Sequence, residues 1–411
     1  MEDKNLSQQM GTLSPKLKEI LSQLRVAATT RGYQLYLVGG GVRDLLLERP
    51  VSELDIVVLG DASAIAKDLA ETGGQLVLHP AFGTATVTLG STRVDLSSAR
   101  TESYDRPGAL PTVSPGTLKD DLERRDFTVN ALAVSLGTDD YGQLIDYGVG
   151  QTDLTEGLIR VIHEHSFVDD PTRIWRAVRY EQRLGFEIEP QTLKWLKRDL
   201  VGLKDLTGDR VWHELACVLQ EDTPRHALVR LDRLGILKLI HPSLQADDWL
   251  DEKIRKADLA GHSSLPVRLA LLTYRLNGNE LEECAGYLNF SKSLRRVLQQ
   301  VLVLKHALWV LGIPGISPYT IYSLLHECDP EAIEVCLIAD DFSLAQKNID
   351  LYRNRLEKVK TALTGSDLLA LGVKPGPQVE ELLQKLLEAR LNGQVKSRAE
   401  EIALAKTIIA R

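Results

Sequence analysis

The sequence predicts an α+β protein, with an α/β head built around one sheet and an all-helical remainder. From residue 34 to residue 146, short β-rich runs such as YLVGG, LDIVVLG and TATVTL alternate with helical stretches. After Gly157 the strand-like runs nearly stop, and segments such as RIWRAVRYEQRLGF and RVWHELACVL repeat apolar residues with the helical period. We therefore expect one sheet near the N-terminus and helices from there to Arg411.

Composition narrows the class of protein. The 411 residues suffice for several domains, and the net charge of −8 argues against wholesale coating by nucleic acid while allowing a local basic groove. No apolar run approaches membrane-spanning length, so we expect a cytoplasmic protein without membrane contact. The four scattered cysteines form no CxxC pair and are expected to be small buried hydrophobes. The oligomeric state is not predicted.

Local sequence patterns predict where individual helices and loops lie. Residues 1–14 are polar and are expected to fray, whereas Pro15 to Arg31 and Ala62 to Thr72 have helical spacing. Arg100 to Pro115 contains three prolines and is expected to be a long loop. The helical part is expected to break near residues 312–318 and 371–377, where Gly and Pro cluster.

A glycine turn lies between the first predicted strand and a short helix. Gly39, Gly40 and Gly41 offer free N–H groups at a helix N-terminus, a combination typical of anion sites. Arg43 follows in the first turn, where it could meet a phosphate. The alternative is a plain tight turn. The Walker A pattern GxxxxGK[ST] is absent.

Two carboxylates follow the turn. Glu53 and Asp55 are two apart on the next predicted strand, so both should leave one face, where they could act catalytically and hold Mg²⁺. A solvated edge strand is the alternative. Asp95, in the run RVDLSS, is a third candidate catalytic acid, or it caps the end of its strand.

Two further clusters combine arginines with acids. Arg124, Arg125 and Asp126 precede a predicted strand that carries Asn130, and they suit polyphosphate and ribose hydroxyls. After Asp169 and Asp170, four arginines recur at steps of three, three and four, on one side of a predicted helix. Such a stripe faces either an anion or acids of the core. Its members are Arg173, Arg176, Arg179 and Arg183.

These motifs, in the order in which they follow one another along the chain, resemble those of the class II tRNA nucleotidyltransferases and bacterial poly(A) polymerases. Both belong to the polymerase-β-like nucleotidyltransferase superfamily. The matching segments are LVGGGVRD with the acid pair, RRDFTVNALA, DYGVGQTDL, DDPTRIWRAVRYEQRLGF and LTGDRVWHEL. The resemblance is dense from residue 34 to residue 215 and thin elsewhere. Two positions depart from the usual pattern, since Glu53 and Asp169 replace the more common Asp and Glu, which leaves nucleotide preference open.

The resemblance implies an architecture and roles. It divides the chain into an N-terminal extension and helix (1–33), a head (34–156), a base-recognising neck (157–220), a helical body (221–316) and a tRNA-binding tail (317–411). Mg²⁺ would lie on Glu53 and Asp55, and the base would be read by Asp170 and Arg173. Phosphate and ribose contacts would come from Gly39, Gly40, Arg43, Arg124, Arg125, Asp126 and Asn130, with Arg176 and Arg179 nearby.

The implied reaction is addition of CCA, CC or the terminal A to the 3′ end of tRNA from CTP and ATP by two-metal chemistry. The intact loop from Arg100 to Val113 slightly favours A addition. The alternatives are a template-independent poly(A) polymerase and a catalytically silent RNA-binding homologue. The mixed charges of Gln378 to Arg411 weigh mildly against the first, and the intact phosphate, ribose and base clusters weigh against the second.

A stretch without acids suggests where tRNA could touch an acidic chain. Residues 285–326 contain no Asp or Glu, although the chain has 57 of them. Lys292, Arg295, Arg296 and Lys305 fall in this stretch and are candidate contacts to the tRNA backbone. The alternative is a buried helix whose few basic residues cap it.

Overall fold

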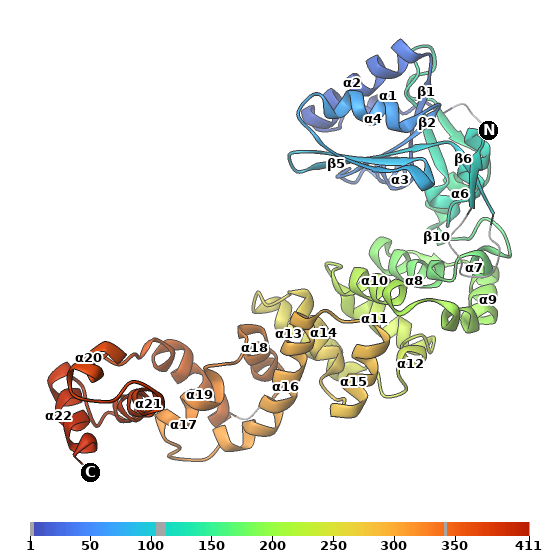
Figure 1. The fold of residues 1–411 in the computed structure, drawn as a ribbon. Coiled ribbons are helices and arrows are strands. Elements are labelled where there is room, and N and C mark those ends of the chain that lie inside the picture. Colours follow the sequence, from blue (N-terminus) through green and yellow to red (C-terminus); the bar gives the residue numbers. More distant parts are fainter. Residues whose placement is uncertain (1–3, 104–111, 341–342, 411) are drawn as a thin grey trace. The chain divides into compact units, whose positions relative to one another are not determined.

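A computed structural model describes residues 4–103, 112–340 and 343–410 of the chain. The chain divides into two compact units, Met1–Thr223 and Pro224–Arg411. The sheet lies in the first unit and the second is helical, as the sequence predicts (Figure 1). The finer division into head, neck, body and tail stays a prediction.

The first unit contains one seven-stranded sheet with strand order β3-β4-β5-β2-β1-β8-β9. β1 lies near the centre and pairs antiparallel with β2 and β8, while β2 pairs parallel with β5. The parallel register sets Asp55 of β2 directly beside Asp95 of β5. The strands are β1 (Gln34–Val38), β2 (Leu54–Leu59), β3 (Gln75–His79), β4 (Thr84–Leu89), β5 (Thr92–Ser98), β8 (Leu132–Ser135) and β9 (Leu144–Asp146).

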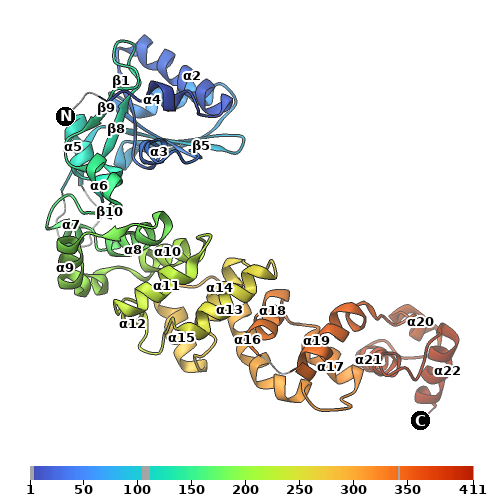
Figure 2. The same ribbon diagram turned by 180° about the vertical axis from the view of Figure 1, so that it is seen from behind.

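Helices cover both faces of this sheet. α2 (Pro15–Arg31) and α4 (Ala62–Ala70) lie side by side on one face, as Figure 1 and Figure 2 show from opposite directions. On the other face, Leu118 and Leu122 of α5 (Leu118–Glu123) pack against Val57. Because side chains alternate along a strand, Asp55 shares the face of Val57. The residues that follow α5 therefore emerge on the side of the sheet that carries Asp55.

Shorter elements complete the first unit. Two small sheets pair β6 with β7 and β10 with β11. The remaining helices are α1 (Ser7–Met10), α3 (Gly40–Leu46), α6 (Gly150–Glu156), α7 (Ser166–Asp169), α8 (Thr172–Leu184), α9 (Pro190–Asp199) and α10 (Gly208–Leu219), with 3₁₀ turns at Pro80–Phe82, Thr128–Asn130 and Leu200–Asp205. The short strands are β6 (Arg100–Ser103), β7 (Thr112–Pro115), β10 (Leu158–Ile159) and β11 (Glu187–Ile188).

The structure corrects three local predictions. The segment before Pro15 does not fray from residue 4 onward, because Leu6, Met10 and Leu13 are buried. The predicted loop between Arg100 and Pro115 begins and ends as paired strands, β6 and β7, and residues 104–111 between them lie outside the described part. The predicted strand that carries Asn130 is a 3₁₀ turn at that point, and only Leu132–Ser135 is a strand.

The second unit is helical throughout its described residues. Its central helix, α14, is almost wholly buried among α13, α16 and α18. A smaller core joins α20, α21 and α22 through Leu368, Leu386 and Ala405. The helices are α11 (Pro224–Arg233), α12 (Leu237–Ile240), α13 (Asp248–Leu259), α14 (Leu265–Thr273), α15 (Gly278–Tyr287), α16 (Lys292–Leu311), α17 (Pro318–Leu325), α18 (Pro330–Ala339), α19 (Ser343–Asn354), α20 (Gly365–Ala370), α21 (Pro377–Leu391) and α22 (Arg398–Ile409), with a 3₁₀ turn at Leu356–Lys358.

Other predictions about the helices can be checked directly. The predicted breaks are confirmed, since α16 ends at Leu311 before α17 begins at Pro318, and α20 ends at Ala370 before α21 begins at Pro377. Within the described ranges, no helix is both long and apolar enough to span a bilayer. Two of the four free cysteines are buried (Cys284 and Cys336), and two are partly exposed (Cys217 and Cys328).

The docked N-terminal segment yields a test of the fold. Leu6 has an exposed fraction of 0%, so Leu6→Ala should lower the free energy of unfolding by about 2–5 kcal/mol through lost burial and a residual cavity. Urea denaturation followed by circular dichroism measures this. Val26→Ala is the control, because Val26 on α2 is 65% exposed. Equal midpoints for the two variants would mean that the segment is not part of the core.

Candidate functional site

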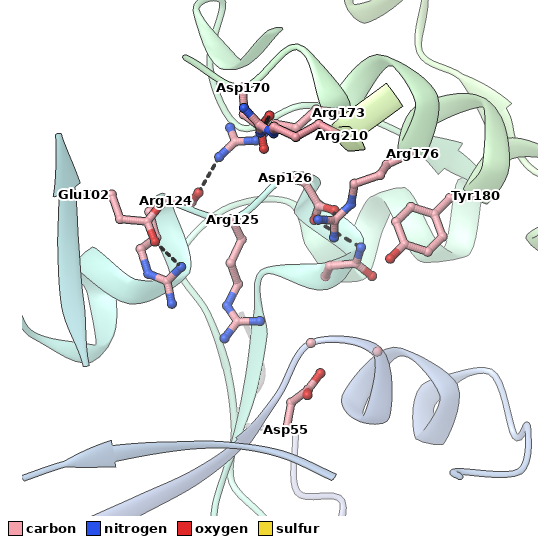
Figure 3. Close-up of a pocket in the computed structure, with 13 residues that line it drawn as sticks. Asp55, Glu102, Arg124, Arg125, Asp126, Asp170, Arg173, Arg176, Tyr180 and Arg210 are labelled. Atoms are coloured by element: carbon pink, nitrogen blue, oxygen red, sulfur yellow. Dashed lines mark hydrogen bonds and ion pairs between the residues drawn. The ribbon is translucent and has the colours of Figure 1, made fainter. Parts of the chain in front are cut away.

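One cavity of the first unit gathers most of the predicted site residues. Its volume is about 340 Å³, and ten predicted residues line it. Asp55 and Arg125 lie at one end, and Asp170, Arg173 and Arg210 lie at the other (Figure 3). The lining residues are Gly39, Gly40, Asp55, Glu102, Arg124, Arg125, Asp126, Asn130, Asp170, Arg173, Arg176, Tyr180 and Arg210.

Gly39 closes the Asp55 end of the cavity. Its φ of 70° and ψ of −136° form a backbone conformation that residues other than glycine rarely adopt. A Cβ on Gly39 would also lie 3.0 Å from Nη1 of Arg125 and 3.3 Å from Oδ2 of Asp55. Backbone conformation and close approach of charged groups therefore both require glycine here.

The Asp55 carboxylate lies near charges of both signs. Burial raises the pKa of Asp55 above its ordinary value, and the neighbouring charge of Arg125 opposes that rise. Negative charge on Asp95 and Glu53 raises the pKa of Asp55 further. A group of acids that destabilise one another's ionised form is one that a cation would stabilise.

The three predicted acids occupy different positions. Glu53 is exposed and lies just before β2, which begins at Leu54. The predicted strand face shared by Glu53 and Asp55 is therefore not formed, because Glu53 is not part of the strand. Asp95 lies beside Asp55 in register, but one of its oxygens accepts from Thr86 Oγ1 at 2.6 Å and the other pairs with Nε of Arg93 at 2.8 Å. Among the described residues, no three His, Cys, Asp or Glu side chains form a preformed metal cluster. Glu53 and Asp95 do not line the cavity.

Arg124 and Arg125 enter the cavity from the end of α5, tied together by one buried carboxylate. Asp121 accepts from Nε and Nη2 of Arg124 at 3.0 and 2.6 Å, and from Nη2 of Arg125 at 3.0 Å. Nη1 of Arg124 also donates to Glu102 of β6 at 2.9 Å. Nε of Arg125 is buried without a hydrogen-bond partner.

Asp126 is the centre of a second buried network. Its Oδ1 accepts from the Phe127 amide at 2.8 Å and from Nδ2 of Asn130 at 3.1 Å, while Oδ2 pairs with Nη2 of Arg176 at 2.5 Å. Burial alone would raise the pKa of Asp126, but Arg176 and these hydrogen bonds outweigh it and hold the pKa below its ordinary value. The bonds fold residues 127–130 into a turn, which explains why the predicted strand fails there.

Asn130 links this network to Arg43. Its Oδ1 accepts from Nη1 of Arg43 at 2.8 Å, and Nε of Arg43 donates to Asp44 at 2.9 Å. Arg43 is buried and lies behind Gly40, outside the cavity lining. Asn130 also lines the cavity, so its predicted contact with the ligand stays a prediction, whereas Arg43 supports the turn from behind the lining.

The opposite end of the cavity is built by the start of α8. Asp170 accepts from the amide and hydroxyl of Thr172, which follows it in the chain, and pairs with Nη2 of Arg210 at 2.8 Å. Nη2 of Arg173 donates to the carbonyl of Arg124 at 2.7 Å, while its Nη1 is buried without a hydrogen-bond partner. This end therefore offers a carboxylate and guanidinium N–H groups side by side.

Only part of the arginine stripe reaches the cavity. Arg173 and Arg176 line it, whereas Arg179 stands 5.5 Å over the ring of Tyr180, and Arg183 pairs with Glu221. The start of the stripe therefore faces the polar cavity, and its later members lie near Glu221, which follows α10.

The sequence prediction misses four residues of the site, of which Tyr180 and Asp121 carry a signal in their spacing. Tyr180 stands seven residues after Arg173 and four after Arg176, on the same helix face. Asp121 stands three and four residues before the two arginines that it binds. Arg210 belongs to the segment LTGDRVWHEL, for which the family resemblance implies no specific role. Glu102 is brought near by the pairing of β6 with β7, which sequence spacing does not reveal.

Three of the four predicted tRNA contacts in the second unit bond to other residues of that unit. Arg295 donates to the carbonyls of Phe290 and Ala285, and Arg296 pairs with Asp329 through two bonds of 2.8 and 2.7 Å. Lys305 donates to the carbonyl of Tyr274, and Lys292 is exposed at the start of α16. Contact of these residues with tRNA stays a prediction.

Comparison with known protein families gives two matches. The model of the poly A polymerase head domain matches residues 35–160, which include the glycine turn, both arginines and Asp126. A second model, described as a probable RNA and SrmB-binding site of polymerase A, matches residues 185–248.

Relatives extend the likeness along the chain. An A-adding tRNA nucleotidyltransferase of Halalkalibacterium halodurans is 32% identical over 96% of this chain and 93% of its own length. Another of that name, from Geobacter sulfurreducens, is 37% identical over 90% of this chain, which spans only 44% of that relative. A CC-adding tRNA nucleotidyltransferase of Deinococcus radiodurans is 33% identical over 90% of this chain and 87% of its own length.

A solved structure shares the fold. The Thermotoga maritima CCA-adding enzyme complexed with tRNA is 28% identical to this chain, with a TM-score of 0.77 and full coverage of both chains.

Gly39 offers a test of the cavity. In Gly39→Ala the new Cβ would push against Arg125 and Asp55, so ATP affinity should fall about tenfold or more as these groups shift. Gly32→Ala controls for positive φ, because Gly32 has φ 69° and nothing within 4 Å of its Cβ position. Isothermal titration without tRNA measures both. Equal ATP affinity in the two variants would show that the ligand does not depend on the Gly39 turn.

Proposed function

Because this chain belongs to the tRNA nucleotidyltransferase family, we propose that it extends the 3′ end of tRNA with nucleotides from ATP or CTP and releases pyrophosphate. The observation that carries the proposal is the two-ended cavity of Figure 3. A nucleoside triphosphate has the same polarity, with phosphates at one end and a hydrogen-bonding base at the other. The volume of about 340 Å³ lies within the usual range for small-molecule sites.

The phosphates belong at the Asp55 end. Arg125 reaches over Gly39 there, and its buried Nε has no hydrogen-bond partner, as expected of a donor that awaits an anion. A glycine turn lets phosphate oxygens approach the backbone, and a guanidinium group binds them through paired N–H groups. In this arrangement the chain holds the triphosphate while the tRNA 3′ oxygen bonds to the α-phosphorus and the bond to pyrophosphate breaks.

Divalent metals are general in polymerase-family nucleotidyltransferases, and we propose Mg²⁺ for this chain. Asp55 would hold it together with Glu53, as the sequence predicts, and Asp95 on the adjacent strand is the third candidate acid. The fit is supported by oxygen donors on adjacent strands and by the raised pKa of Asp55, which burial and the neighbouring acids cause. Mg²⁺ commonly takes one or two carboxylates and fills its shell with water and substrate phosphates. Its charge would stabilise the transferred phosphoryl group.

The base belongs at the Asp170 end. Asp170 supplies acceptors, and Arg173 supplies donors whose Nη1 has no hydrogen-bond partner. Adenine and cytosine both present an amino donor beside a ring nitrogen acceptor, whereas guanine and uracil present the reverse. A buried site with fixed partners rejects the mismatched base because its own groups would stay unpaired. Asp126 and Asn130 lie between the two ends, where the ribose would fall.

We further propose that the nucleotide added is the terminal A. Two relatives named A-adding, at 37% and 32% identity, support this choice, and the CC-adding relative at 33% is the competitor. Poly(A) synthesis, which the name of the head-domain family suggests, is the other possible outcome. A tRNA substrate supports the predicted cytoplasmic location.

One assay tests the proposal. Purified protein is incubated with Mg²⁺, each labelled nucleotide in turn, and tRNA that ends at the discriminator base, in C, in CC or in CCA. We expect a single A on tRNA ending in CC, no product from GTP or UTP, and no extension of tRNA ending in CCA. Long adenosine tracts on unrelated RNA would favour poly(A) polymerase. Addition of C to tRNA that ends at the discriminator base or in C would show that the activity is CC or CCA addition, in place of the proposed A addition.

Asp55→Asn links the assay to the site. The change keeps the shape of the side chain but removes the charge that would hold the cation, so incorporation should fall by about a thousandfold or more while tRNA binding stays within about twofold of wild type. Asp139→Asn, an exposed acid of the same unit, is the matched control. Incorporation by Asp55→Asn within tenfold of the control would remove Asp55 from the reaction.

A further inference from the structure

One buried carboxylate controls both arginines that enter the cavity from α5. Asp121 has an exposed fraction of 0%, and each of its oxygens serves a different arginine. Oδ1 accepts Nε and Nη2 of Arg124, and Oδ2 accepts Nη2 of Arg125. A short helix that ends just before the two arginines makes this possible, since residues three and four apart lie on one helix face.

The two arginines then diverge toward different partners. Nη1 of Arg125 lies over Gly39 beside Asp55, at the proposed phosphate end. Arg124 turns the other way, donating to Glu102, while its carbonyl accepts from Arg173 of the proposed base end. Asp121 therefore stands at the branch point between the two ends of the cavity.

The charges favour a positioning role over simple neutralisation. Glu102 also pairs with Arg100, so two carboxylates alternate with three arginines in one connected group. This group keeps a net positive charge, which attracts a triphosphate. Guanidinium groups this close repel one another, and a carboxylate between them fixes their spacing and the direction of their free N–H groups.

We propose that Asp121 is a positioning residue for nucleotide binding, which sets Arg125 against the triphosphate beside Gly39. The inference rests on the proposed function, and it assigns Asp121 no contact with substrate. A positioning role differs from a role in stability alone. Loss of an ion pair that serves only stability would weaken the binding of every ligand of the cavity equally.

The test compares two ligands that differ only in phosphates. Asp121→Asn should lower ATP affinity about tenfold or more and AMP affinity less than about threefold, because the β- and γ-phosphates depend on the position of Arg125. Asp121→Glu keeps the charge but moves it by one methylene, and it should show the same ATP-selective loss. Glu123→Gln, an exposed acid of α5 that pairs with Lys119, is the matched control and should leave both affinities unchanged.

A double-mutant cycle identifies the route of the effect. If Asp121 acts through Arg125, Asp121→Asn in an Arg125→Ala background should change ATP affinity by less than about twofold. Equal losses for ATP and AMP, or additive losses in the cycle, would overturn the inference. Failure of Asp121→Asn to fold, with an Asp121→Glu that binds ATP as wild type does, would also overturn it. Wild-type protein that binds no ATP would instead contradict the proposed function.

Discussion

Mutual repulsion among the arginines that line it is the constraint on which the cavity of the first unit depends. Arg124, Arg125, Arg173 and Arg176 converge on one space, and each must be held by a partner that does not remove it from the cavity. Asp121, Asp126 and the carbonyl of Arg124 are those partners. Such buried pairs add little net stability, since desolvation offsets the attraction, so their benefit lies in orientation. Nε of Arg125 and Nη1 of Arg173 stay without a hydrogen-bond partner, so each end of the cavity keeps a donor available for a ligand.

The same partners connect parts of the chain that are distant in sequence. Asp126 couples Asn130 to Arg176 of α8, and Arg173 couples α8 to the end of α5. Both ends of the proposed nucleotide are thereby fixed to one sheet, since α5 packs on the face of β2 that carries Asp55. This geometry suits a reaction in which the protein mainly positions substrates and neutralises charge.

Sequence reasoning located the elements of the site well because they are local. The glycine turn, the Arg124–Arg125 pair and the start of α8 are each contiguous, so composition and spacing sufficed for them. It placed Arg43 in the cavity, whereas Arg43 lies behind the lining and donates to Asn130, because an arginine that meets a phosphate and one that supports a turn look the same in sequence. Glu102 was missed because strand pairing of β6 with β7 brings it near Arg124, and no spacing rule reports such a contact. The prediction that the N-terminal segment frays is wrong for residues 4–14, because three buried apolar side chains outweigh a polar composition.

A structure of the full chain with ATP and a divalent cation would test the central claim most directly. The triphosphate should lie between the Gly39–Gly40 turn and Arg125, with the cation on Asp55 and the adenine against Asp170 and Arg173. Clear density for ATP elsewhere, or an inverted ATP with its base at Asp55, would contradict this reading of the cavity.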